Sequence, residues 1–198
     1  MKRLISVLVI LAVASFAFAG GESEGGGYAD GIYFAQQDTF NENTGWKYMV
    51  TLEVEDGKIV MAEWNGANVN AGRDKITVSE SGDYGMVANG GAQSEWHVQA
   101  AKVEEYLLEV QDPTKIEYNS DDGTTDAISG VSIHINEFVE LAEEALQQGA
   151  VGYGPYKDGA YHAEGAEFDH GWKDRVDLTV VSGRIVAAYW NPVDEAGN

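Results

Sequence analysis

Apolar and polar residues alternate regularly along one stretch near the start of the chain. Val50, Leu52 and Val54 alternate with polar residues, Asp-Gly follows at positions 56–57, and a second alternating run ends at Trp64. A period of two predicts strands with one buried face, and Asp-Gly favours a type I′ hairpin turn. An earlier strand is expected near residues 31–37. We therefore predict a three-stranded antiparallel meander.

The same pattern recurs later in the sequence. The stretch from Gly45 to Asn65 aligns without a gap with the stretch from Gly171 to Asn191, and 12 of the 21 positions are identical. Ser-Gly at 182–183 stands where the first copy has Asp-Gly. Self-similarity of this density indicates an internal repeat. Residues 153–198 are thus predicted to be the β-meander that begins a second copy.

Only the first copy continues with helical periodicity. Its first helix is predicted from apolar residues spaced by four and three, and it ends before Asp-Pro at 112–113. Residues 115–118 are expected to form a short strand. A second helix is expected from an N-cap at Asn136 to Gly149. The apolar positions are Trp96, Ala100, Val103, Leu107 and Val110 in the first helix, and Phe138, Leu141, Ala145 and Leu146 in the second.

These elements predict an α+β protein, in which an antiparallel sheet of hairpins packs with two helices over residues 28–149. The second copy stops after its hairpin, and a half-domain with exposed sheet edges is hard to stabilise alone. Two explanations stay open. The pattern favours a chain that is a truncated piece of a longer tandem protein, and the alternative is that the extra strands pack on the first domain.

The first residues predict export. Lys2 and Arg3 precede an apolar run that ends in Ala-Phe-Ala at 17–19, which is typical of a cleaved signal peptide over residues 1–19. An uncleaved anchor is the alternative. Residues 20–27 are rich in glycine and predict a short flexible tether. We expect a location in the periplasm, on the cell surface or outside the cell.

Charge and cysteine content exclude several classes of protein. The formal net charge is −21, and a surface this acidic repels nucleic acid and anionic lipid. The chain contains no cysteine. It therefore has no disulfide, no zinc–thiolate site, no iron–sulfur cluster, and no cysteine at which a bacterial lipoprotein would be anchored.

One stretch, "DAISGVS" at 126–132, carries candidate chemistry. It contains Asp126, Ser129, Gly130 and Ser132. A serine hydroxyl is a poor nucleophile without a base beside it, and the stretch lacks the second glycine of a nucleophile elbow. A hydroxyl that accepts a group from another enzyme needs no internal base. It needs exposure, and a nearby glycine that lets the enzyme and a phosphate approach the backbone.

The stretch resembles the acceptor motif of FMN-binding domains, as found in the C subunit of the sodium-translocating NADH:quinone oxidoreductase, in Rnf G subunits and in exported tandem flavoproteins. The resemblance extends to the "DGxYxA" opening, the "GW" strand entry, the "DGKIV" hairpin and the helix that ends in "QDP". It covers residues 28–149 in full and 153–198 as the front of a second copy. Two departures from the family motif are Val131 for alanine and Ser132 for the commoner threonine.

The resemblance implies covalent FMN, phosphoester-linked to Ser132 by a magnesium-dependent flavin transferase that uses FAD. It also implies a non-enzymatic electron carrier with membrane redox partners. Two interpretations of Asp126 stay open: it helps to seat the transferase and its metal, or it is an Asx-turn residue. A flavin ring needs flat apolar walls. The candidate wall residues are Trp46, Trp64, Tyr84 and Trp96, although tryptophan in a sheet is more often core.

Three alternatives stay open at this point. The first is an exported module of the same fold that binds flavin or another ligand without a covalent link, such as a surface antigen. The second is a hydrolase that uses Ser132 and His134, which would share a face of an extended segment. The third is a metal site in the second copy, whose candidate ligands are His162, Glu164, Glu167, Asp169 and His170; a solvated hairpin face is the ordinary reading of such residues, and we expect no metal.

Overall fold

The structure is a computed structural model, and it describes residues 27–197. The expected signal segment (1–19) and nearly all of the expected tether (20–27) lie outside these residues. Between Gly27 and Gly197, no helix has the length and apolar character needed to cross a bilayer.

The first repeat opens with the expected meander. Strands β1 (Gly31–Gln36), β2 (Trp46–Glu55) and β3 (Lys58–Asn68) form an antiparallel sheet in the order β1-β2-β3. Asp56 and Gly57 have φ angles of 50° and 73°, so both turn residues lie in the left-handed region that a type I′ turn requires. The hairpin prediction is confirmed.

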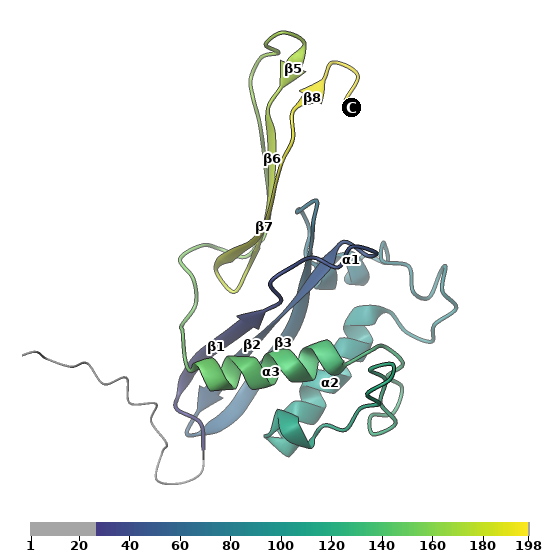
Figure 1. Ribbon diagram of the computed structural model, residues 1–198, viewed down its shortest axis with the longest axis vertical. Helices are drawn as coiled ribbons and strands as arrows, with labels where there is room; N and C mark the ends of the chain where they lie inside the picture. Colours follow the sequence, from purple (N-terminus) through teal and green to yellow (C-terminus); the bar gives the residue numbers. More distant parts are fainter. Residues whose placement is uncertain (1–26, 198) are drawn as a thin grey trace, which may run out of the picture.

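Helices cover one face of this sheet. Helix α2 (Trp96–Val110) lies along β3, and α3 (Asn136–Gln148) crosses β1 and β2 (Figure 1). Their apolar stripes face the sheet as the spacing predicts, so Val103, Leu107 and Phe138 are completely buried. The α+β fold class is therefore confirmed, with the main core between the sheet and the two helices.

Two local predictions are wrong. Residues 115–118 form no strand, because Asp112 accepts a hydrogen bond from the Thr114 N–H and starts a 3₁₀ turn, η1 (Pro113–Lys115). Asn136 is the first helical residue of α3 and not its N-cap, which is Ile135. The short helix α1 (Lys75–Glu80) was not predicted, since six residues are too few for a periodic pattern.

The second repeat forms its own antiparallel sheet. Strands β4 (Gly159–Glu164), β6 (Arg175–Val181) and β7 (Arg184–Trp190) pair in the order β4-β6-β7, and β5 (Trp172–Lys173) pairs with β8 (Val193–Asp194) at the far end. The register shifts between Glu53 and Val54 in the first copy and at the equivalent Thr179 and Val180 in the second. The two meanders therefore share an irregularity that sets strand twist.

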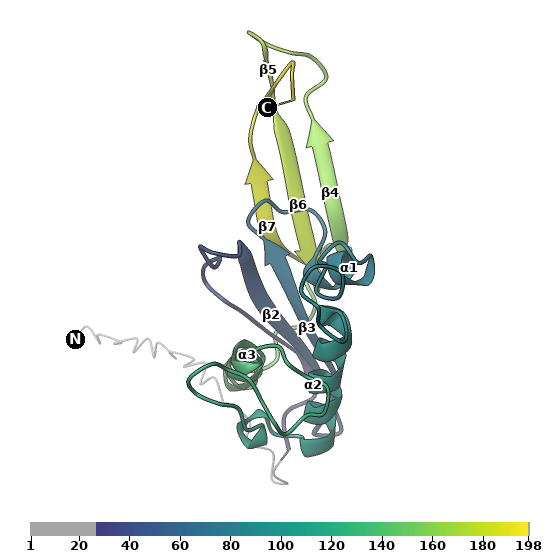
Figure 2. The same cartoon turned by 90° about the vertical axis from the view of Figure 1, so that its right-hand side faces the viewer.

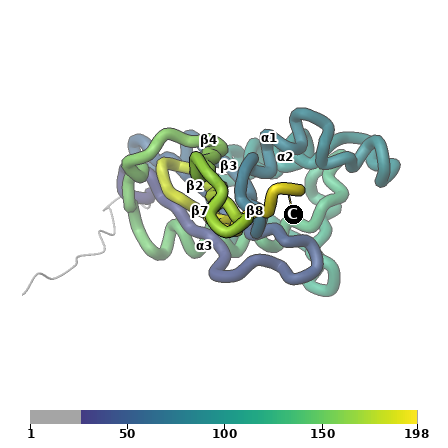
Figure 3. Tube along the Cα trace, turned by 90° about the horizontal axis from the view of Figure 1, so that it is seen from above, coloured from purple at the N-terminus to yellow at the C-terminus, as the bar shows by residue number. Residues whose placement is uncertain are grey.

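The end of the second sheet at the β6–β7 turn packs on the face of the first sheet that carries no helix, and the rest of the second sheet extends beyond the first (Figures 2 and 3). Hydroxyl groups join the sheets: Thr51 Oγ1 lies 2.5 Å from Ser182 Oγ, and Thr179 Oγ1 donates to the Gly72 carbonyl at 2.8 Å. The ends of β6 and β7 therefore contact the first domain. A small second core forms there from Phe34, Met49, Ala67, Val181, Val186 and Ala187.

Each repeat braces its hairpin turn with an aspartate. Asp158 accepts hydrogen bonds from the Ser182 and Gly183 N–H groups at 2.9 and 2.6 Å, and Asp30 accepts one from Gly57 at 3.0 Å. We expect Asp158→Ala to cost the β6–β7 hairpin about 1–2 kcal/mol, because two charge-assisted bonds to backbone donors are lost at a partly exposed site. Hydrogen exchange of the turn amides measures this loss of local stability.

The control is Asp158→Asn, which keeps an acceptor and should reduce the stability of the hairpin less. An equal reduction in both variants would contradict the explanation.

Candidate functional site

The acceptor stretch forms bends and a turn over residues 126–130, and its apolar side chains pack into the main core. Ile128, Val131, Ile133 and Ile135 are buried, whereas the intervening Ser132 side chain faces solvent, as do Asp126, Ser129, Gly130 and His134. Gly130 has a φ angle of 76°, which a glycine adopts without strain. The apolar residues anchor the segment and hold the Ser132 hydroxyl at the surface.

Gln99 of α2 positions Ser132. Its Oε1 atom accepts hydrogen bonds from the Ser132 backbone N–H at 2.7 Å and from the Ser132 hydroxyl at 3.2 Å. The Gln99 Nε2 group donates to the Ser94 carbonyl, which fixes the amide orientation. An amide oxygen is not a base, and the Ser132 hydroxyl bonds to it rather than to His134. The geometry therefore does not form the serine–histidine pair of the hydrolase alternative.

A lysine one turn further along α2 lies under the turn. Lys102 Nζ donates to the carbonyl groups of Ser129 and Gly130 at 3.3 and 3.4 Å. It provides a cation at the turn that precedes Ser132, in a chain of strongly negative charge. The sequence analysis missed Lys102 and Gln99. Gln99 follows Trp96 by three residues and Lys102 follows it by six. This spacing places all three residues on neighbouring turns of one helix, and it is the sequence pattern that could have indicated them.

The four aromatic residues proposed as flavin walls gather in one cluster, together with Tyr48. The rings of Trp64 and Trp96 are 5.1 Å apart, and Trp46 and Tyr84 meet edge to face at 6.1 Å. The tryptophans are almost fully buried. The cluster joins β2, β3, α2 and the loop after α1, so it also belongs to the core.

Lys75 fills the space between these rings, and we call the arrangement the lysine box: Lys75 surrounded by Trp46, Tyr48, Tyr84 and Trp96. The Nζ atom lies 4.3–5.1 Å from the four ring centroids and donates to the hydroxyl groups of Tyr48 and Tyr84 at 2.9 Å. The side chain is completely buried. Ring faces attract an ammonium group. The Lys75 side chain therefore fills the space between the four rings.

Burial shifts two ionisable groups toward their neutral forms. Desolvation lowers the pKa of Lys75 to about 7, although the nearby Glu137 carboxylate favours the charged form. Desolvation also raises the pKa of Glu104 to about 7, while the backbone N–H of Trp64, 2.7 Å from Glu104 Oε1, opposes this shift. Both groups thus titrate close to neutral pH.

Besides a cavity of about 450 Å³ that borders Asp126, another cavity lies directly beside Ser129. It has a volume of about 360 Å³ and is lined by Lys102, Glu105, Tyr106, Glu109, Ala127, Ile128 and Ser129. This volume falls within the range of small-molecule sites, which begins near 300 Å³. A cavity of about 390 Å³ between the β1–β2 loop and α3 is lined mainly by polar and acidic residues.

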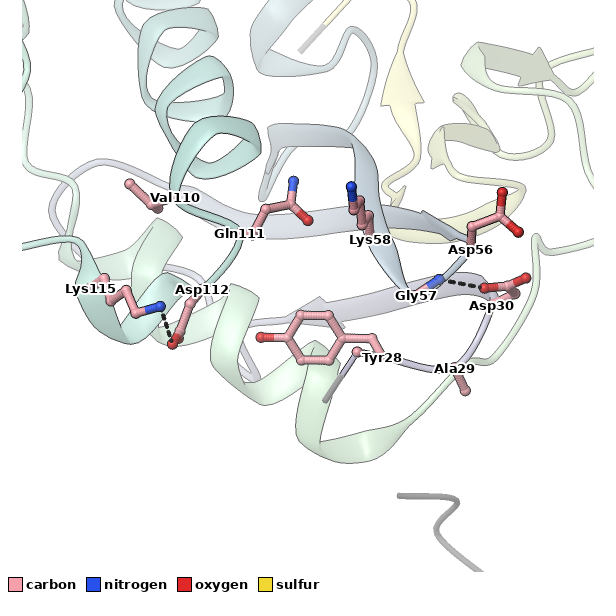
Figure 4. A pocket seen from close by; sticks show the side chains of 11 residues that line it. Tyr28, Ala29, Asp30, Asp56, Gly57, Lys58, Val110, Gln111, Asp112 and Lys115 are labelled. Carbon is pink, nitrogen blue, oxygen red and sulfur yellow. Dashed lines mark hydrogen bonds and ion pairs between the residues drawn. The ribbon is translucent and has the colours of Figure 1, made fainter. Parts of the chain in front are cut away.

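A larger cavity of about 710 Å³ lies at the other end of α2 (Figure 4). It is bordered by Tyr28, Gly57, Lys58, Gln111 and Lys115 among other residues. Gln99 and Gln111 are separated by about 18 Å along the helix axis, at 1.5 Å per residue. This cavity is therefore remote from Ser132, and the sequence analysis gave no indication of it.

The histidines of the second copy lie within hydrogen-bond distance of acidic side chains. His162 Nδ1 is 2.7 Å from Asp177 Oδ1, and Arg175 holds the other Asp177 oxygen at the same distance. Lys173 pairs with Glu164. In residues 27–197, no three histidine or acidic side chains form a group that could hold a metal ion.

Comparisons with known proteins give two related structures. The chain is similar to a Clostridium thermocellum protein solved by solution NMR, with 55% identity over 60% of this chain and 90% of the other and a TM-score of 0.47. A Clostridium perfringens protein solved by crystallography has 25% identity over 62% and 88%, with a TM-score of 0.48. At these TM-scores neither likeness carries an argument about fold or function. No family model and no curated protein matches the chain.

Proposed function

We propose that this protein is an exported electron carrier with FMN attached through a phosphoester bond to Ser132. The observation that supports it best is the exposure of the Ser132 residue, whose hydroxyl, in the described part of the chain, hydrogen-bonds to the Gln99 amide and not to a base. A group that only accepts FMN from a flavin transferase requires this arrangement, whereas a nucleophilic enzyme requires a base.

Attachment forms a bond between Ser132 Oγ and phosphorus and breaks the pyrophosphate bond of FAD. AMP leaves, and the hydroxyl proton passes to the transferase. Lys102 lies close enough to the turn to favour the negative phosphate. Asp126, exposed at the start of the stretch, remains the proposed contact for the transferase and its metal.

The flavin ring is proposed to lie in the cavity beside Ser129, against Tyr106 and Ile128. The ring faces inside the lysine box are taken by Lys75, so the box itself has no room for a flavin while Lys75 stays in place. Bound flavin supplies the electron storage, and the protein supplies tethering, partial burial and local charge. Membrane redox partners with basic docking faces would suit the acidic surface.

Co-expression with a flavin transferase tests the proposal. The exported protein should gain the mass of one FMN ester, and its flavin fluorescence should survive boiling in detergent. Ser132→Ala should lose both signals completely, because no other oxygen replaces the attachment point. Ser120→Ala is the matched control and should keep them, since Ser120 is exposed and lies outside both the acceptor stretch and the cavity beside Ser129.

Three outcomes separate the possibilities. Covalent flavin in Ser132→Ala would move the attachment elsewhere. Absence of covalent flavin in every variant would contradict the attachment, and titration with free FMN would then distinguish a non-covalent flavin module from a domain that binds no flavin. A carrier must also take up and release electrons reversibly in a spectroelectrochemical titration.

A further inference from the structure

The outer face of the second sheet repeats most of a face that is covered in the first, although Asp174 stands where the first copy has Tyr48. The repeat alignment pairs six positions, and each pair has the same amino acid: Tyr33 with Tyr161, Val50 with Val176, Leu52 with Leu178, Ile59 with Ile185, Ala62 with Ala188, and Trp64 with Trp190. The strand registers place these residues on one face in each sheet.

The burial of the two faces differs sharply. In the first sheet, Trp64 is 1% exposed beneath α2 and α3, and Tyr33 is 2% exposed. In the second sheet, Trp190 is 73% exposed and Tyr161 is 43% exposed. Within residues 27–197, no helix lies across β4, β6 and β7 (Figure 2). Contiguous exposed apolar surface of this kind marks an interaction site.

In the first repeat, side chains of α2 and its C-terminal cap also hydrogen-bond to the backbone of the edge strand β3. Glu104 of α2 accepts a hydrogen bond from the Trp64 backbone N–H at 2.7 Å. Gln111, seven residues later, accepts from the Ile59 N–H at 2.9 Å and donates to the Ile59 carbonyl at 2.8 Å. Helix α2 therefore recognises the edge of β3 as well as its apolar face. Among the described residues, no side chain bonds the equivalent backbone groups of Ile185 or Trp190 in β7.

We propose that the outer face of the second sheet docks a helix pair of the α2–α3 type, supplied by another polypeptide segment. The first helix would lie along β7 and the second across β4 and β6. The recognition elements are an apolar stripe with the spacing of Trp96, Ala100, Val103 and Leu107, and an acid and an amide at the positions of Glu104 and Gln111. The shared bulge gives both sheets the same local twist, so a helix pair shaped for one sheet fits the other. The proposal does not depend on flavin.

The test uses the full chain extended after Asn198 by a second copy of residues 66–149. Linking the segment raises its effective concentration at the face. We expect the amides of Ile185 and Trp190 to exchange with solvent at least tenfold more slowly than in the unextended chain. Extensions in which the copies of Val103 and Leu107 are aspartate should give no such protection.

A pair of substitutions locates the contact. In the extended chain, Trp190→Ser should abolish the protection, whereas Trp172→Ser, at another exposed tryptophan outside the six-residue face, should leave it unchanged. Equal exchange in the extended and unextended chains would overturn the proposal. So would light scattering that shows the unextended chain dimerising in a manner lost with Trp190→Ser, because the occupant would then be the same face of a second copy.

Discussion

Between pH 7 and about pH 9.5, the free energy of unfolding should rise by about 2–4 kcal/mol. The pKa of Lys75 is lowered to about 7 in the folded protein from 10.5 in the unfolded chain. Above pH 7 the unfolded chain therefore binds one more proton at this residue than the folded protein does, and stability increases with pH in that window. The stabilisation is complete above pH 10.5 and is lost as the pH falls through 7.

Glu104 gives the opposite slope on the acid side. Its pKa is raised to about 7 from 4.5, so the folded protein binds the extra proton between pH 4.5 and 7, and stability falls as the pH rises through that window. The two groups together predict a minimum of stability near pH 7. Denaturant unfolding at a series of pH values measures the curve.

Substitutions assign each limb of the curve. Lys75→Met should flatten the alkaline limb and Glu104→Gln the acid limb, since each removes the titrating group. Lys58→Met, at an exposed position on β3, should change neither limb. A stability maximum at pH 7 in the unmodified protein would show that the lysine box keeps its ammonium charged well above neutral pH.

Val181→Asp should separate the second sheet from the first. Val181 is 2% exposed in the small core with Phe34 and Met49, and an unpaired carboxylate there costs at least about 3 kcal/mol. The first repeat keeps its own core between the sheet and the helices. Hydrogen exchange should therefore lose protection across β4, β6 and β7 while α2 and α3 stay protected.

Ile185→Asp provides the control for this prediction. Ile185 is 46% exposed on the opposite face of the same sheet, so the charge stays in water and exchange should change little. If Val181→Asp instead reduced protection equally in both repeats, the two sheets would be one cooperative unit. The small core would then contribute to the stability of the whole chain.

The core between the first sheet and the helices could be predicted from the sequence, because each strand or helix there has a single regular spacing of apolar residues. Val50, Leu52 and Val54 are buried as their alternation predicts. Thr51 lies on the other face of β2, where the pattern indicates solvent, yet it is 1% exposed because the second sheet covers it. The alternation in a strand identifies its more apolar face as buried. It does not predict that the other face, which contains both polar and apolar residues, is covered by a distant segment.

Only those features of the candidate site that depend on neighbouring residues in the sequence could be predicted. The exposure of Ser132 follows from the alternation of Val131 and Ile133 around it. The contact with Gln99 joins residues 33 positions apart, and nothing in the local pattern indicates it. Lys75 is the harder case, because a lysine in a polar stretch predicts a surface residue, and only the assembled aromatic rings make its burial possible.

The placement of the five tryptophans gives the chain a built-in optical reporter. Trp46, Trp64 and Trp96 are shielded in the first repeat, while Trp172 and Trp190 are more than half exposed in the second. Indole emission shifts to longer wavelength as the ring meets water, so the spectrum of the intact chain contains a blue component from one repeat and a red component from the other. The unfolding of each repeat can therefore be followed separately from its own emission component, without an attached label.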